Sequence, residues 1–94
     1  MIKIGLLGCG NVGHIIATHA ESIQVVAVFD IIPGRAERLA TLCHARPYTD
    51  FEAFMQEDFS IVVEAASVDA VKLYAEAILR SGRDIAILSG GALA

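Results

Sequence analysis

The 94-residue chain is short of several residue types, and each shortage excludes a class of protein. It has no tryptophan, two cysteines and two prolines, and two cysteines cannot form the disulfide framework of a small secreted domain. Its charged residues amount to 19%, whereas roughly 25% is ordinary for a soluble domain. Because 55% of the residues are apolar, the chain is not of the disordered class, which combines low hydrophobicity with high net charge.

Two further absences concern location and partners. No apolar run approaches the roughly 18 residues of a membrane-spanning helix, and no signal peptide is evident at the N-terminus. We therefore expect a cytoplasmic protein with no membrane partner. The net charge is −4, and the seven lysines and arginines are scattered, so no basic stripe predicts a nucleic acid partner.

Short apolar runs alternate with segments of helical periodicity. Four runs rich in valine or isoleucine are apolar on both faces, as expected of strands buried between helical layers; they are residues 2–7, 25–29, 60–65 and 84–89. A weak strand is predicted at residues 46–49, where Pro47 favours a sheet edge.

The segments between the strands predict four helices. In the first two, apolar residues recur at helical spacing: Val12, Ile15, Ile16, Ala20 and Ile23, then Ala36, Leu39, Ala40 and Cys43. Residues 49–52 fit a capping box, which predicts a short helix through Met55. Ser67 can cap the last helix, and Gly82 ends it in a left-handed conformation. The apolar face of that helix carries Val68, Val71, Ala75, Ile78 and Leu79.

This alternation predicts an α/β fold with right-handed crossovers. We expect residues 1–94 to form one dinucleotide-binding domain. Its architecture is a Rossmann-type, doubly wound parallel sheet of about five strands in three α-β-α layers.

A glycine-rich loop carries the chemistry. Gly8, Gly10 and Gly13 form GxGxxG directly after a predicted strand and at the start of a helix, which is the context the motif requires. Gly8 permits a tight turn, Gly10 admits a pyrophosphate to the backbone, and Gly13 lets helix and strand pack closely. Free N–H groups of the loop, including those of Asn11 and Val12, would face the phosphates.

Asp30 ends the second predicted strand, where a carboxylate accepts hydrogen bonds from the adenosine ribose. The same charge repels a 2′-phosphate, so NAD is the expected cofactor, with NADP possible because Arg35 follows closely. The alternative for Asp30 is a strand-end carboxylate in a turn.

Small residues follow the last two strands at the same edge. Ala65, Ala66 and Ser67 leave room for the cofactor, although Ser67 can also be a simple helix cap. Ser89 and Gly90 are expected to approach the nicotinamide end, the alternative being an ordinary turn.

No catalytic residue and no metal site are predicted. Cys9 and Cys43 are expected to be structural, and they are too far apart for a CxxC motif. His14 and His19 are five residues apart rather than four, so they do not match the zinc-binding HExxH spacing; His44 lies on a connection. Tyr48 and Tyr74 lack a lysine at YxxxK spacing.

The segments IGLLGCGNVG, VVEAASVDAVKLYAEAILRSGRDIAILS and SGGALA together resemble the N-terminal half of the L-aspartate dehydrogenases. The resemblance implies a two-domain, homodimeric enzyme that oxidises L-aspartate to iminoaspartate with NAD or NADP and can feed NAD biosynthesis. It also implies that the catalytic histidine belongs to a C-terminal domain absent from this chain, so that the 94 residues alone are inactive. Two alternatives remain: half of a homoserine, sugar or dihydrodipicolinate reductase type of dehydrogenase, or a standalone NAD-binding module without catalysis.

Overall fold

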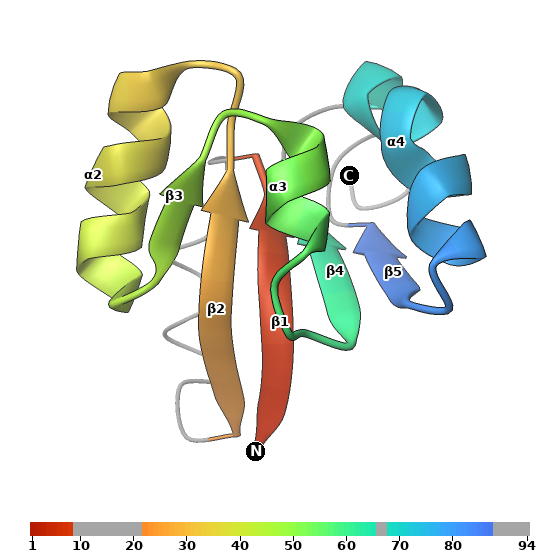
Figure 1. Ribbon diagram of the computed structural model, residues 1–94, viewed down its shortest axis with the longest axis horizontal. Coiled ribbons are helices and arrows are strands. Elements are labelled where there is room, and N and C mark those ends of the chain that lie inside the picture. Colours follow the sequence, from red (N-terminus) through yellow and green to blue (C-terminus); the bar gives the residue numbers. More distant parts are fainter. Residues whose placement is uncertain (9–21, 66–67, 88–94) are drawn as a thin grey trace.

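Five parallel strands form the centre of the protein. The computed structural model describes residues 1–8, 22–65 and 68–87. The strands are β1 (Ile2–Leu7), β2 (Ile23–Phe29), β3 (Arg46–Tyr48), β4 (Ile61–Glu64) and β5 (Asp84–Ile87). They pair in the order β3-β2-β1-β4-β5, as Figure 1 shows, and every pairing is parallel. The weak strand with Pro47 is at an edge, as predicted.

Three helices are described: α2 (Pro33–Cys43), α3 (Phe51–Met55) and α4 (Val68–Arg80). Pro33 begins α2 because its fixed φ suits the first helical position and its missing N–H would have no partner there. At its other end His44 adopts a left-handed conformation with φ 56°. Gly82 follows α4 with φ 84°, so its predicted left-handed conformation is confirmed.

The two faces of the sheet carry separate apolar clusters because side chains alternate along each strand. On one face, Ile4, Leu6 and Val28 pack with Leu39 of α2 and its neighbours. On the other face, Leu7 and other strand residues pack with residues of α3 and α4: Ala27, Phe29, Val62, Phe54 and Ile78. Helices therefore cover both faces, and the predicted three-layer arrangement is confirmed.

All six aromatic residues of the chain lie in the second cluster, on the α3 and α4 face. The Phe51 ring of α3 stacks on the Tyr74 ring of α4 with their centroids 4.3 Å apart. Gly5 of β1 lies beneath this layer, where an added Cβ would be 2.8 Å from ring carbons of both Phe54 and Phe59. A side chain at position 5 would thus push α3 away from the sheet.

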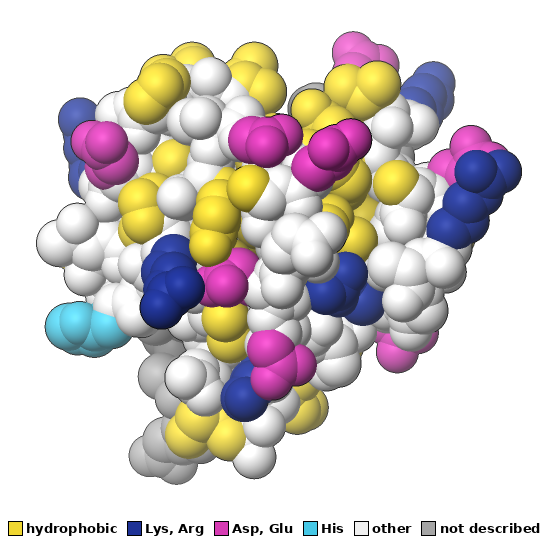
Figure 2. Space-filling view, in the orientation of Figure 1, with side chains coloured by type: hydrophobic (Ala, Val, Ile, Leu, Met, Phe, Trp, Pro, Cys, Tyr) yellow, Lys and Arg dark blue, Asp and Glu magenta, His cyan; other side chains and the backbone are white. Residues whose placement is uncertain are grey.

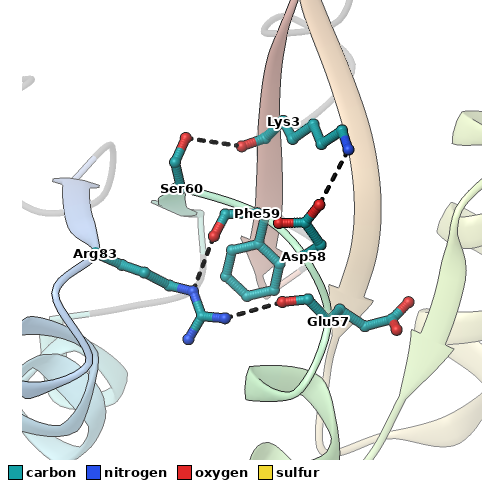
Figure 3. Close-up of polar contacts among 6 residues, drawn as sticks. All are labelled: Lys3, Glu57, Asp58, Phe59, Ser60 and Arg83. Carbon is teal, nitrogen blue, oxygen red and sulfur yellow. Dashed lines mark hydrogen bonds and ion pairs between the residues drawn. The ribbon is translucent and has the colours of Figure 1, made fainter.

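Arg83 joins the start of β5 to the connection between α3 and β4 (Figure 3). Its guanidinium donates hydrogen bonds to the carbonyl oxygens of Met55, Glu57 and Phe59 at 2.8–2.9 Å. The same group lies 4.4 Å from the centroid of the Phe59 ring. Because Met55 is the last residue of α3, Arg83 supplies a donor to a helix end that would otherwise lack one.

Four expectations were wrong in detail. Residues 84–87 form β5 at an edge of the sheet, where the strand is largely exposed rather than buried between helical layers. Ile23 belongs to β2, where it pairs with Ile2, and not to the first predicted helix, whose other residues lie outside the described ones. The N-cap of α3 is Asp50 rather than Thr49, because the Asp50 carboxylate accepts the N–H of Glu52. Leu79 is 58% exposed, because α4 meets the sheet through Ile78 instead.

Candidate functional site

The carboxyl ends of the parallel strands meet at one edge of the sheet, at the top of Figure 1. From β1 the chain first builds β2 and β3 on one side, and then returns to build β4 and β5 on the other. The order therefore reverses between β1 and β4. In open α/β sheets such a reversal point is where ligands bind, outside the carboxyl ends of the strands.

Gly8 leaves β1 at this edge in a conformation that only glycine adopts readily. Its φ is 89°, and its N–H donates a 2.7 Å hydrogen bond to the carbonyl oxygen of Phe29, the last residue of β2. Gly8 thus has the positive φ that the predicted tight turn requires, and its N–H is tied to the neighbouring strand.

Asp30 leaves β2 at the same edge, and its carboxylate is held by its own loop. Its Oδ1 accepts the N–H of Ile32 at 2.9 Å, while its N–H donates to the carbonyl oxygen of Tyr48 at 3.0 Å. The residue is 8% exposed. The following residues, Ile31 and Ile32, are 73% and 44% exposed, and Figure 2 shows apolar side chains along this upper edge. Arg35 is exposed in the first turn of α2.

Ala65 leaves β4 beside Gly8. Its N–H donates a 2.9 Å hydrogen bond to the carbonyl oxygen of Leu7, and the residue is 5% exposed. Its neighbour Glu64 is completely buried, which the sequence reasoning missed. The available signal was a single charged residue at the end of an otherwise apolar strand.

The structure thus brings Gly8, Asp30 and Ala65 together at the carboxyl ends of three adjacent strands, β1, β2 and β4. The remaining predicted site residues lie outside the described residues: Gly10, Asn11, Val12, Gly13, Ala66, Ser67, Ser89 and Gly90. Cys9, His14 and His19 also lie outside them.

A comparison with protein families decides what this edge belongs to. The family model "Homoserine dehydrogenase, NAD binding domain" matches residues 5–94. The chain belongs to this family of NAD-binding domains. Its predicted fold class and nicotinamide dinucleotide cofactor, NAD or NADP, are confirmed with it.

Individual relatives of this NAD-binding domain are longer proteins. It is 57% identical over 93 residues to the L-aspartate dehydrogenase of Methanospirillum hungatei and 35% identical over 99 residues to that of Methanocaldococcus jannaschii. These alignments cover 99% and 100% of the chain, but 37% of each relative. The resemblance to the L-aspartate dehydrogenases is thereby confirmed. Among solved structures, the WlbA dehydrogenase of Bordetella pertussis in complex with NADH and UDP-GlcNAcA has the same fold, with a TM-score of 0.78 at 21% identity, over 99% of this chain and 30% of that one.

The described edge has the features that a dinucleotide needs. A glycine with positive φ follows β1, a small residue follows β4, and a carboxylate follows β2. The Asp30 carboxylate accepts one hydrogen bond from Ile32, and each carboxylate oxygen has two lone pairs, so it can accept further bonds from hydroxyl groups.

Of the two cysteines that we expected to be structural, Cys43 lies in the described part of the chain and has a packing role there. Cys43 is half-buried against the cluster on the α2 face, and burial raises the pKa of its thiol. His44 is an exposed helix end, and Tyr48 and Tyr74 join the aromatic cluster. Within residues 1–8, 22–65 and 68–87, no group of three His, Cys, Asp or Glu side chains can hold a metal ion. The helices in those ranges are all too short or too polar to cross a bilayer.

Proposed function

We propose that the chain is the cofactor-binding part of an L-aspartate dehydrogenase, which oxidises L-aspartate to iminoaspartate and transfers the hydride to NAD or NADP. The observation that carries this proposal is 57% identity, over 99% of the chain, to the Methanospirillum hungatei enzyme of that name. A cofactor supplies the redox chemistry in such enzymes, and the protein binds and orients it.

The proposed roles follow the positions along the edge. Gly8 and the N–H groups of the loop after it hold the pyrophosphate, together with Gly10, Asn11, Val12 and Gly13. Asp30 accepts hydrogen bonds from the adenosine ribose and repels a 2′-phosphate, which favours NAD over NADP. The small residues after β4 and β5 line the groove toward the nicotinamide: Ala65, Ala66, Ser67, Ser89 and Gly90.

Substrate binding and proton transfer belong to the part of the relatives that the chain does not span. The proposal therefore assigns residues 1–94 to the dinucleotide-binding domain and the catalytic residues to a second domain. We also propose that the enzyme is a homodimer, is cytoplasmic and has a role in NAD biosynthesis. These three points rest on the sequence resemblance.

Two measurements test the proposal. Calorimetric titration of the 94-residue chain with NADH should show saturable binding, and the same chain should not reduce NAD in the presence of L-aspartate. The full-length gene product should reduce NAD with L-aspartate and not with L-homoserine. Preference for homoserine would replace the substrate assignment, and absence of NADH and NADPH binding would overturn the cofactor role.

A further inference from the structure

Glu64 is a buried charge for which the proposed roles give no use. Among the described residues, only Asp30 and Glu64 are charged and buried, at 8% and 0% exposure. Burying a carboxylate is costly unless hydrogen bonds compensate it. That requirement is met, because no buried side-chain oxygen or nitrogen of the described residues lacks a hydrogen-bond partner.

The position of Glu64 relates it to the cofactor site. It is paired in register with Leu7 of β1 and with Ile87 of β5, so it lies in the last row of the sheet at the point where the strand order reverses. By alternation from Val62, its side chain belongs to the face that α3 and α4 cover. Asp30 follows Phe29, which ends β2 in the same row on the other side of β1.

A dinucleotide whose adenosine half lies at Asp30 must extend across β1 toward β4 and β5. Strands are about 4.8 Å apart, so the half of the dinucleotide that would lie over the ends of β4 and β5 would come within roughly 5–10 Å of Glu64. That half carries the nicotinamide ring. The oxidised ring has a positive charge and the reduced ring is neutral, whereas the diphosphate has the same charge in both forms.

We propose that Glu64 selects the oxidised form of the cofactor, because its carboxylate places a negative charge near the nicotinamide ring at the β1–β4 reversal. This inference rests on the proposed function. The Glu64 charge stabilises the positive ring of NAD⁺ and leaves neutral NADH unaffected. It therefore changes the ratio of the two affinities, whereas a side chain that only supported the fold would change both together.

The test is calorimetric titration of the 94-residue chain with NAD⁺ and with NADH, before and after Glu64→Gln. At about 10 Å and an effective dielectric constant of about 40, loss of one unit charge should raise the ratio Kd(NAD⁺)/Kd(NADH) about fourfold. The matched control is Asp58→Asn, which removes an equal charge at the opposite edge, where Asp58 pairs with Lys3 at 3.1 Å (Figure 3). The control should leave the ratio unchanged.

A second pair of variants keeps the test decisive if Glu64→Gln does not fold. Ile87 is 46% exposed and is paired in register with Glu64, so Ile87→Lys adds a positive charge in the same row of the sheet while the Glu64 side chain stays in place. This variant should raise the same ratio, and Ile87→Gln should not. An unchanged ratio in every folded variant, with NAD⁺ and NADH still bound, would overturn the inference alone. If the unsubstituted chain binds none of NAD⁺, NADH, NADP⁺ and NADPH, the proposed function fails and the inference with it.

Discussion

Replacing Asp30 is the most direct test of how this domain holds its cofactor. The carboxylate has two separable tasks in our account. Its Oδ1 accepts the Ile32 N–H at 2.9 Å, which shapes the loop between β2 and α2. Its charge and remaining lone pairs are proposed to bind the adenosine ribose. Asp30→Asn keeps an acceptor oxygen for Ile32 and removes the charge, whereas Asp30→Ala removes both.

The magnitude follows from these contacts. Hydrogen bonds to a charged group contribute roughly 1.5–3 kcal/mol, so Asp30→Ala should weaken NADH binding by about 12- to 150-fold. The cost to the fold should be smaller, because the described fold loses only the one hydrogen bond that the Asp30 side chain accepts from the Ile32 N–H. Binding of NADPH should weaken less or improve, since the charge that repels its 2′-phosphate is gone. Asp30→Asn should reduce the difference between the NADH and NADPH affinities in the same way, with a smaller loss of NADH affinity.

The assay is titration of each variant with NADH and NADPH, with urea unfolding measured in parallel. Asp50→Asn is the matched control, because Asp50 accepts the N–H of Glu52 in the same i to i+2 geometry but lies on the exposed side of the α3 terminus. It should leave the affinities for both cofactors unchanged. If Asp30→Ala binds NADH and NADPH with the same affinities as the unsubstituted chain, the assignment of Asp30 as the ribose ligand is refuted.

Four further predictions concern the frame that carries the site. Gly5→Ala should lower the free energy of unfolding by about 1–3 kcal/mol, because the new Cβ meets two buried rings; Gly34→Ala, with open space around it, should be neutral or stabilising in the same urea titration. Arg83→Lys should lower the melting temperature, because the single ammonium group of lysine cannot replace the planar guanidinium that donates to three carbonyl oxygens. Hydrogen bonds from a charged group contribute about 1.5–3 kcal/mol each. His44→Gly should raise the free energy of unfolding by about 0.5–1 kcal/mol, because the position requires a positive φ; an unchanged value would contradict this. Burial raises the pKa of the Cys43 thiol, so the stability that the neutral thiol contributes is complete below the ordinary pKa of a thiol and is lost as the pH rises through the folded-state value. The free energy of unfolding of Cys43→Ala should therefore fall less over that alkaline range than that of the unsubstituted chain. Equal falls in the two proteins would refute this.

Much of the fold could be predicted because the deciding signals are local. Four of the five strands contain an apolar run, and the fifth, β3, contains Pro47, which cannot donate in the middle of a sheet, so β3 had to lie at an edge. The errors lie where tertiary contacts decide. Ile23 continues the helical spacing before it, yet it pairs with Ile2 in the sheet. Leu79 fits the apolar face of α4 by spacing, but contact with the sheet runs through Ile78.

The site shows the same division between local and tertiary information. Gly8 and Asp30 could be placed at one edge because parallel strands bring their carboxyl ends together, and the described geometry agrees. A single charged residue at the end of an apolar strand marks Glu64 as unusual, but its complete burial depends on α3 and α4 covering that end of the sheet, which the strand pattern does not say. The same holds for Arg83, whose three carbonyl partners are 24 to 28 residues away in sequence. Motifs therefore predict the strand ends at which a cofactor would bind, whereas the burial of Glu64 and the carbonyl partners of Arg83 become visible only when the strands and helices are in place.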